Sequence, residues 1–332
     1  MQNEKLLTIS IASYNVEKCL AYCLDSLILK NENFKLLDII IVNDGSKDGT
    51  LSVAKKYIDM FPDVFRVVDK ENGGYGSTIN SSIAIAKGKY YKLLDADDLF
   101  DTDGLNNLID FIKNKSNEVD LIISKYIKNY TDVNRQEIIT DFKEKVVNKS
   151  ITLDYFNSIP AMHSICVKTN CIRDMHIQEH CFYTDNEYVA YVLLHTKNFS
   201  TIDSCIYIYN LGLNDQSVSV NGLRKHLRDW NNVYRAIKKM FDDSNANYNC
   251  IEMIQKIQKE LVYAMYLAYL VQKNSYQYKK ELMNIDAFIK SEDVEIYKLT
   301  NQIKVVKALR ISKFYLYRLL SKEITRRMET TK

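Results

Sequence analysis

Carboxylates occur where two apolar runs of the chain end. Asp44 follows one run, and Asp95 and Asp97 follow another, while the first apolar run of the chain ends in the polar turn Ser13-Tyr14-Asn15. Carboxylates are hard oxygen ligands, and Mg²⁺ or Mn²⁺ binds through one or two of them together with substrate phosphates. An Asp-x-Asp beside a diphosphate would provide such a site. A single carboxylate at an accessible strand end, such as Asp44, could instead accept hydrogen bonds from a base or a ribose hydroxyl.

A loop of small residues, 72–78, contains three glycines at positions 73, 74 and 76. Its backbone N–H groups could approach a phosphate or a sugar closely, because few side chains block them. The structural alternatives are plain. Asp-Gly and Asn-Gly pairs form turns, and Asp48 or Thr50 would cap a helix. Taken alone, each motif is weak evidence for a ligand.

The elements that must position these residues alternate between strand and helix. The apolar runs predict strands at Leu6–Ala12, Leu37–Val42, Phe65–Asp69 and Tyr90–Leu94, and helices at Val16–Leu29, Thr50–Met60, Ser77–Ala86 and Leu105–Lys113. This alternation predicts an α/β fold with a mostly parallel sheet flanked by helices. Ligands of such sheets bind at the carboxyl ends of the strands, so the acidic groups are expected to gather at one edge.

The rest of the chain divides into a mixed and a helical part. Leu121–Tyr130 and Ile138–Phe142 could pair as strands, Ile206–Asn210 is a short predicted strand, and Tyr183–Leu194 is a predicted loop entering a helix. From residue 222 onward all periodicity is helical, ending in a predicted tail from Val294 to Met328. We therefore predict a nucleotide-binding and catalytic domain at residues 1–220 and a helical C-terminal region at residues 221–332.

Composition excludes several classes of protein. The chain has 332 residues, 46% hydrophobic and 26% charged, and its net charge of +3 is too small to indicate a nucleic-acid partner. Its seven cysteines contain no CxxC pair, which argues against a zinc site and for a reduced, cytoplasmic setting. No signal peptide is predicted at the N-terminus, and no apolar run approaches the length of a membrane span.

Three motifs together resemble the inverting glycosyltransferase family 2, which has the GT-A fold. Residues 8–15 are similar to the family's nucleotide-binding first strand, residues 40–50 to its acidic second-strand turn, and residues 88–98 to its Asp-x-Asp segment. The resemblance extends from about Leu7 to Ser219. It implies a UDP-sugar donor and a bound Mn²⁺ or Mg²⁺.

The resemblance also implies roles for individual residues. Asp97 would be the direct metal ligand, Asp95 would contact the ribose or the hydrated metal, and Asp44 would contact uracil. The remaining donor-binding positions that it implies are Ser13, Tyr14, Asn15, Gly74 and Asn80. Ile79 stands where the family's commoner form has an Arg, which indicates a subgroup of bacterial enzymes that assemble cell-surface polysaccharides.

Residues 182–188 resemble the family's later acidic motif, whose Asp is the catalytic base. Asp185 takes that place, although Thr184 replaces the usual Glu, and Glu187 is the fallback. Asp185 opens an apolar helix, where free N–H groups and the helix dipole would favour its ionised form. The structural alternative is that Asp185 is only a helix cap. Residues 214–219 resemble a loop that closes over the donor diphosphate, or they form an ordinary polar loop.

The predicted function is metal-dependent transfer of a hexosyl or N-acetylhexosaminyl group from a nucleotide-sugar to a glycan or lipid-linked acceptor. Such an enzyme is expected in the cytoplasm, with membrane contact through a basic amphipathic C-terminal helix or, equally, with that helix packed on the catalytic domain. The apolar positions of this helix are Ile303, Val306, Leu309, Phe314, Tyr317, Leu320 and Ile324. Its cations are Lys304, Lys307, Arg310, Arg318, Lys322, Arg326 and Arg327.

Three other functions compete with this prediction. A haloacid-dehalogenase-type phosphatase also has a strand followed by Asp-x-Asp, but usually close to the start of the chain. A dinucleotide-binding protein would need a third glycine where Ile79 stands. A non-catalytic nucleotide-sugar-binding protein would keep Asp44 without needing Asp97 or Asp185.

Overall fold

The structure is a computed structural model that describes residues 4–115, 119–212, 219–244, 250–273 and 275–330. The chain forms two compact units. The first consists of Met1–Leu213 with Asn245–Glu252, and the second consists of Asn214–Ser244 with Met253–Lys332. We call them the sheet unit and the helical unit. The predicted diphosphate loop at 214–219 lies outside the described residues, except for Ser219.

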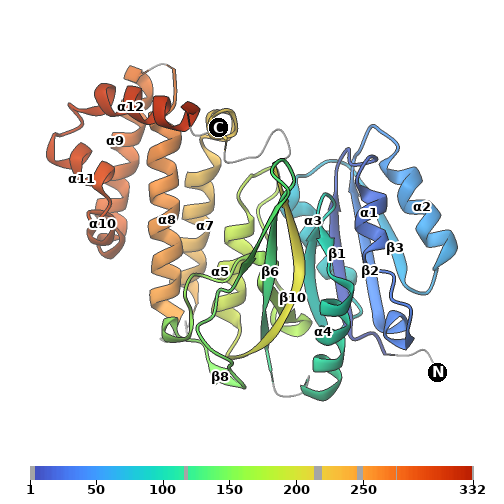
Figure 1. Ribbon diagram of the computed structural model, residues 1–332. Coiled ribbons are helices and arrows are strands. Elements are labelled where there is room, and N and C mark those ends of the chain that lie inside the picture. Colours follow the sequence, from blue (N-terminus) through green and yellow to red (C-terminus); the bar gives the residue numbers. More distant parts are fainter. Residues whose placement is uncertain (1–3, 116–118, 213–218, 245–249, 274, 331–332) are drawn as a thin grey trace. The chain divides into compact units, whose positions relative to one another are not determined.

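A ten-stranded sheet forms the centre of the sheet unit (Figure 1). Its strand order is β3-β2-β1-β4-β9-β6-β10-β5, with β7 paired to β6 and β8 paired to β10. The first four strands are parallel, as the alternation of strand and helix predicts. They are β1 (Leu7–Ser13), β2 (Leu37–Asp44), β3 (Phe65–Lys70) and β4 (Tyr90–Asp95).

Helices pack along this sheet because each presents an apolar stripe to it. Helix α3 lies against β1 and β2, α2 lies against β2 and β3, and α4 lies against β10. The helices of this unit are α1 (Leu20–Asp25), α2 (Thr50–Met60), α3 (Tyr75–Ile85), α4 (Thr102–Lys115) and α5 (Asp185–His195), with 3-10 turns η1 (Glu32–Leu36), η2 (Leu153–Tyr155), η3 (Met162–Ser164) and η4 (Thr169–Cys171).

The second half of the sheet is mixed. The strands are β5 (Leu99–Phe100), β6 (Leu121–Tyr130), β7 (Arg135–Ile139), β8 (Lys149–Ser150), β9 (Ile165–Lys168) and β10 (Asn198–Leu211). The predicted pairing of β6 with the segment after it is confirmed, in antiparallel register. The short strand predicted at 206–210 is wrong in length, because β10 also includes Ser200 and Thr201. These buried polar side chains accept hydrogen bonds from the backbone of Asn148 and Val146.

The helical unit is built from α6 (Val220–Lys225), α7 (Asp229–Asp243), most of α8 (Ile251–Leu270), α9 (Ser275–Glu292), α10 (Val294–Thr300), α11 (Lys304–Ile311) and α12 (Tyr317–Thr330). The helical tail predicted at Val294–Met328 consists of three helices, so the prediction of one continuous amphipathic helix from Ile303 onward is wrong. Four positions of its predicted apolar stripe, Val306, Leu309, Phe314 and Tyr317, are buried. Tyr317 donates a hydrogen bond to the backbone of Tyr269 at 2.6 Å. None of the described helices is both long and apolar enough to cross a membrane.

Candidate functional site

The carboxyl ends of the first four strands meet at one edge of the sheet. Ser13 pairs with Asn43 across β1 and β2, and Ala12 pairs with Asp95 across β1 and β4. Three buried polar atoms at this edge lack a hydrogen-bond partner among the described residues: Ser13 Oγ, Asn43 Oδ1 and Asp95 Oδ1. Buried polar atoms are nearly always paired. Unpaired donors and acceptors gathered at a strand edge therefore indicate a site for a polar ligand.

The turns after β1 and β2 are fastened to each other. The backbone N–H of Asn15 donates to Ser46 Oγ at 3.0 Å, and Asn15 Oδ1 accepts from the N–H of Lys47 at 2.8 Å. Asn15 has φ of +54°, a conformation in which Asn is among the few tolerated residues. Tyr14, beside it, is 51% exposed. The turn thus holds an exposed aromatic ring at the edge where the unpaired atoms lie.

The carboxylate of Asp44 is occupied by donors of the chain itself. The N–H groups of Gly73 and Gly74 donate to its two oxygens at 2.9 and 2.8 Å, and Lys70 Nζ donates at 2.8 Å. Asp44 is only 3% exposed, so the expectation of an accessible side chain is wrong. The two glycine N–H groups predicted to approach a phosphate are likewise taken. Asp44 anchors the glycine loop, in which Gly74 adopts φ of +81°.

We expect Asp44→Ala to destabilise the protein, in contrast to a substitution at an accessible site. The variant leaves the buried N–H of Gly73, the partly buried N–H of Gly74 and the Lys70 ammonium without their acceptor, which should lower the free energy of unfolding by about 1–3 kcal/mol. Urea denaturation measures this loss. Asp63→Ala, at an exposed acid, is the control. Equal unfolding midpoints for the two variants would show that the loop does not depend on Asp44.

Helix α3 is tied to the segment that leads into α5. Asn80 donates to the carbonyl of Ile177 at 2.9 Å and accepts from its N–H at 2.8 Å. A Cβ on Gly76 would lie 2.0 Å from the carbonyl oxygen of Gln178, so only glycine permits this approach. These contacts give Asn80 and Gly76 positioning roles, because they fix the chain seven and eight residues before Asp185.

Three neighbouring carboxylates lie at the end of β4 and directly after it, and they differ in exposure. Asp97 is exposed, Asp98 is 1% exposed, and the exposure of Asp95 is intermediate. Burial raises the pKa of Asp95, and the charge of Asp97 raises it further. Such repulsion would be relieved by a cation. Among the described residues no group of three or more His, Cys, Asp or Glu could hold a metal. Asp95 and Asp97 therefore fit a divalent ion only if substrate oxygens complete its coordination.

Asp98 fastens this acidic turn to β10. Its two carboxylate oxygens accept from the hydroxyl of Tyr207 at 2.6 Å and from the N–H of Asn210 at 2.7 Å. The Tyr207 hydroxyl also accepts from the N–H of Asp95 at 3.1 Å, and Asn210 Nδ2 donates to the carbonyl of Asp97 at 2.7 Å. Through Tyr207 and Asn210, Asp98 thus holds the backbone that carries Asp95 and Asp97 in place.

Tyr207→Phe should loosen this arrangement. The variant leaves one buried oxygen of Asp98 and the N–H of Asp95 unpaired, which should lower the free energy of unfolding by about 1–3 kcal/mol. Chemical denaturation measures it, with Tyr22→Phe, at a 71% exposed tyrosine, as the control. If the two variants have equal free energies of unfolding, the hydrogen bonds of the Tyr207 hydroxyl with Asp98 and Asp95 contribute nothing to stability.

Asp185 is the first residue of α5 and lies close to Asp95 in space. The charges of both carboxylates act on Tyr75, and that of Asp185 also raises the pKa of Asp95. The hydroxyl of Tyr75 donates to Met162 Sδ at 3.1 Å. Burial raises the pKa of Asp185 despite its position at the helix start. The expectation that the helix start favours the ionised form is therefore outweighed by desolvation.

Glu187, the alternative base, and the ring nitrogens of His163, near the acidic turn, are buried. Glu187 is 3% exposed and accepts from Gln178 at 3.1 Å, so it is already engaged. Both ring nitrogens of His163 are buried and have no partner among the described residues, and burial lowers its pKa to about 3. Lys92, fully buried in β4, donates to the carbonyls of His163 and Ile165. His163 therefore acts as a neutral ring in this structure.

The sequence profile of the family Glycosyl transferase family 2 matches residues 8–175, just over half of the chain. The chain belongs to this family. Putative glycosyltransferase EpsH of Bacillus subtilis (strain 168) is 32% identical over 129 residues, which are 39% of this chain and 36% of EpsH. Minor teichoic acid biosynthesis protein GgaB of the same strain is 33% identical over 109 residues, 33% of this chain and 12% of GgaB. Both matches leave most of the relative's length uncovered.

The fold also resembles that of a solved structure. The crystal structure of S. aureus TarS 1–349 in complex with UDP-GlcNAc aligns with a TM-score of 0.69 at 18% identity, covering 98% of this chain and 91% of that one. The likeness confirms the predicted GT-A fold with a C-terminal helical region. Membership of this glycosyltransferase family overturns the phosphatase and dinucleotide-binding hypotheses.

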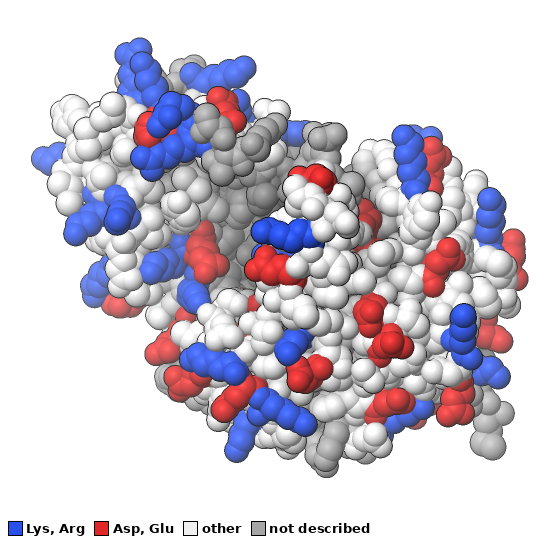
Figure 2. Space-filling view, viewed as in Figure 1, with Lys and Arg blue, Asp and Glu red and all other residues white. Residues whose placement is uncertain are grey.

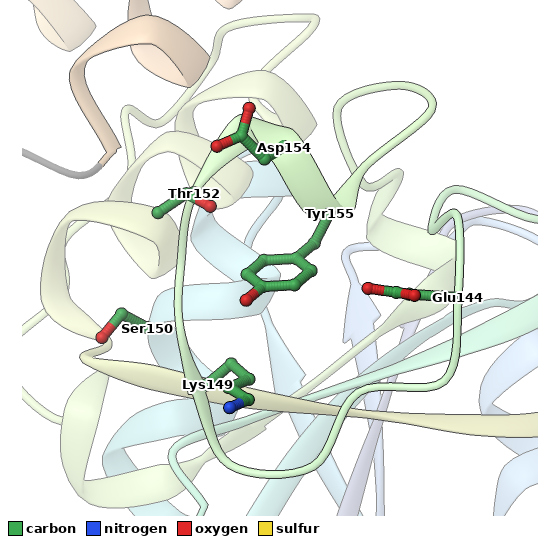
Figure 3. A pocket seen from close by; sticks show the side chains of 6 residues that line it. All are labelled: Glu144, Lys149, Ser150, Thr152, Asp154 and Tyr155. Carbon is green, nitrogen blue, oxygen red and sulfur yellow. The ribbon is translucent and has the colours of Figure 1, made fainter.

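A separate hollow in the sheet unit contains none of the predicted site residues. Its volume is about 480 Å³, and it is lined by Glu144, Lys149, Ser150, Thr152, Asp154 and Tyr155 (Figure 3). All six come from one segment around β8 and η2. The hollow contains no unpaired buried polar atom. The candidate site is therefore the strand edge with Asp95, Asp97 and Asp185.

Sequence reasoning missed three side chains of this edge. The sequence predicts Tyr75 only as part of the glycine loop, and Tyr207 and Asn210 only as residues of a short strand. Their roles depend on contacts with residues far away in sequence, since Tyr207 meets Asp98 across 109 positions. No local motif signals such a contact.

Proposed function

We propose that the protein transfers a sugar, with inversion, from a UDP-sugar to a hydroxyl of a glycan or lipid-linked acceptor in the assembly of a cell-surface polysaccharide. One observation carries the proposal: unpaired buried polar atoms and the separate carboxylates Asp95 and Asp185 converge at one strand edge. The likeness of the fold to that of TarS, solved in complex with UDP-GlcNAc, supports the donor class. The transferred group would be a hexose or an N-acetylhexosamine.

Binding of the donor would use the unpaired groups of the first turns. Ser13 Oγ offers a hydrogen-bond donor and Asn43 Oδ1 an acceptor, which suits the alternating donors and acceptors of a pyrimidine and a ribose. The exposed ring of Tyr14 could stack on the base, with Asn15 holding its turn in place. Asp44 contributes indirectly by anchoring the glycine loop.

A divalent ion, Mn²⁺ or Mg²⁺, would be held by Asp97, with Asp95 contacting the ribose or the hydrated ion. When bound, it supplies positive charge that stabilises the diphosphate as negative charge develops on it. Two unit charges 4 Å apart interact by about 4 kcal/mol at an effective dielectric constant near 20. The role of Asp98 is to orient these two carboxylates through Tyr207 and Asn210.

Asp185 would accept the proton of the acceptor hydroxyl during its attack on the anomeric carbon. Burial raises the pKa of Asp185, which makes its carboxylate a stronger base than an ordinary aspartate. Asp95 and Asp97 would face the leaving diphosphate, so the base must come from another element. A single displacement by the hydroxyl inverts the anomeric centre.

A screen of nucleotide-sugars for donor hydrolysis and for thermal stabilisation tests this function. We expect UDP-sugars to raise the melting temperature and to be hydrolysed slowly when no acceptor is present. A protein stabilised by UDP-sugars that never cleaves them would instead be a binding protein. If no nucleotide-sugar is bound or cleaved, the proposal is wrong.

The acceptor and the location are part of the same proposal. A lipid-linked acceptor would place the enzyme in the cytoplasm at the inner face of the cell membrane. A soluble glycan acceptor would need no membrane contact. Transfer to a detergent-solubilised lipid-linked sugar, compared with transfer to a free oligosaccharide, distinguishes the two.

A further inference from the structure

An exposed apolar cluster lies at the turn between α11 and α12 of the helical unit. It consists of Ile311, Tyr315, Leu316 and Leu319, which are 73, 83, 40 and 65% exposed. We call these four side chains the apolar turn. Single exposed apolar residues are normal on protein surfaces, but four large ones within nine positions indicate an interaction site. They are not the apolar stripe that the sequence predicts, because Val306 and other positions of that stripe are buried.

Buried neighbours force the apolar turn outward. Phe314 and Tyr317, which alternate with its members, are 5 and 2% exposed. Phe314 adopts φ of +61°, a costly conformation for an aromatic residue, and its N–H donates to the carbonyl of Leu309 at 2.7 Å. Packing of Phe314 near Tyr266, with ring centroids 6.4 Å apart, holds the turn in this shape. Because the anchors take the inward positions, the four exposed side chains cannot fold back into the same core.

The surface around the apolar turn is positively charged. No Asp or Glu occurs between Glu295 and Glu323, a stretch that contains seven Lys or Arg. Arg310 is neutralised by Asp286, whose carboxylate lies 2.7 Å away. The other six are exposed, namely Lys298, Lys304, Lys307, Lys313, Arg318 and Lys322, and of these Lys298 is paired with Glu295, whose carboxylate lies 2.8 Å away. Lys279 Nζ of α9 adds a seventh cation, 5.5 Å from the ring of Tyr315. Figure 2 shows Lys and Arg side chains over the helical unit, with uncharged surface and some Asp or Glu side chains among them.

We propose that the apolar turn binds the surface of an anionic lipid bilayer, with its four side chains entering the headgroup region and the flanking cations meeting lipid phosphates. Tyr and Leu side chains beside Lys and Arg are the composition of membrane-surface segments. A second copy of the chain fits this surface less well. A stable protein interface takes about 20–30 residues a side, and a like-charged copy would be repelled. This proposal rests on the proposed function, because membrane binding would bring the enzyme to a lipid-linked acceptor.

Co-sedimentation of the full-length protein with vesicles tests the proposal. We expect binding to phosphatidylcholine vesicles that contain phosphatidylglycerol, weaker binding without it, and release by high salt. Tyr315→Ser with Leu319→Ser should weaken binding by about tenfold or more, because both side chains lose burial in the interface. Replacing Lys313, Arg318 or Lys322 by Gln should cost about fivefold each. Val133→Ser, at a residue 64% exposed in the sheet unit, is the matched control for Leu319→Ser.

Three results would overturn the proposal. The first is a wild-type protein that binds neither kind of vesicle, and the second is equal vesicle binding by the Leu319→Ser and Val133→Ser variants. The third is self-association that disappears in Leu319→Ser, which would make the surface a contact between copies. Donor hydrolysis without vesicles separates this proposal from the proposed function. It should be unchanged in Tyr315→Ser with Leu319→Ser, and its absence from the wild type would refute the enzyme function but not membrane binding.

Discussion

Asp185→Asn is expected to reduce sugar transfer by about 10²–10⁴-fold, with little change in donor affinity or melting temperature. The substitution keeps the size and hydrogen-bonding shape of the side chain but cannot take a proton. Asp185 occupies the first position of α5, and the N-cap position belongs to Thr184, whose side chain makes no capping hydrogen bond. Replacing Asp185 by Asn therefore leaves the main contacts of the helix start intact, so that the loss should be confined to turnover.

The pH dependence of kcat/KM gives a second measurement of the same role. Burial raises the pKa of Asp185, so its carboxylate becomes protonated, and fails as a base, at a higher pH than an ordinary aspartate. The wild-type rate should fall as pH decreases through that raised pKa, and this acid limb should be absent in Asp185→Asn.

Two control variants sharpen the interpretation. Asp174→Asn, at an exposed acid on the segment before α5, should leave turnover intact. Glu187→Gln should affect stability more than turnover, because Glu187 is 3% exposed and bound to Gln178. If Asp185→Asn lowers the melting temperature while turnover per folded molecule is preserved, Asp185 only stabilises the start of α5 and the base lies elsewhere.

The edge of the sheet could be predicted because it depends on local patterns. Alternating apolar runs and polar turns place Asp44 and Asp95 at strand ends, and the observed parallel register brings those ends together. The same patterns also supported the family resemblance, which the profile match confirms. What the local pattern could not predict is which donors each carboxylate meets. The carboxylate of Asp44 accepts hydrogen bonds from the N–H groups of Gly73 and Gly74, 29 and 30 positions away.

The helical end of the chain shows a different limit of sequence reasoning. A stripe of apolar residues at helical spacing predicts that one face is buried, but not against what. In the structure the chain turns at Lys313 and Phe314, both with positive φ, and four of the seven positions of the stripe are buried. The turn brings a different set of apolar residues, including Tyr315 and Leu319, to the surface. Lys and Phe have no propensity for left-handed backbone, so the types of residues 313 and 314 do not predict the turn.

Asp97→Ala is expected to lower transfer by about 10²-fold or more and to abolish its dependence on Mn²⁺ or Mg²⁺. The side chain of Asp97 is exposed, and its carbonyl, which accepts from Asn210 at 2.7 Å, is retained in the variant. Stability should therefore change little. Asp103→Ala, at an exposed acid in the first turn of α4, is the control.

Binding of UDP gives a readout of the metal site that does not depend on catalysis. In the wild type, added Mn²⁺ should increase the thermal stabilisation by UDP, because the ion would link the diphosphate to a pair of carboxylates that repel each other. The charge of Asp97 raises the pKa of Asp95, so removal of Asp97 relieves that repulsion and also removes the reason to bind a cation. UDP should then stabilise Asp97→Ala equally with and without Mn²⁺. Wild-type transfer that proceeds unchanged in the presence of a chelator would exclude the metal, and Asp97 would then need another role at the strand edge.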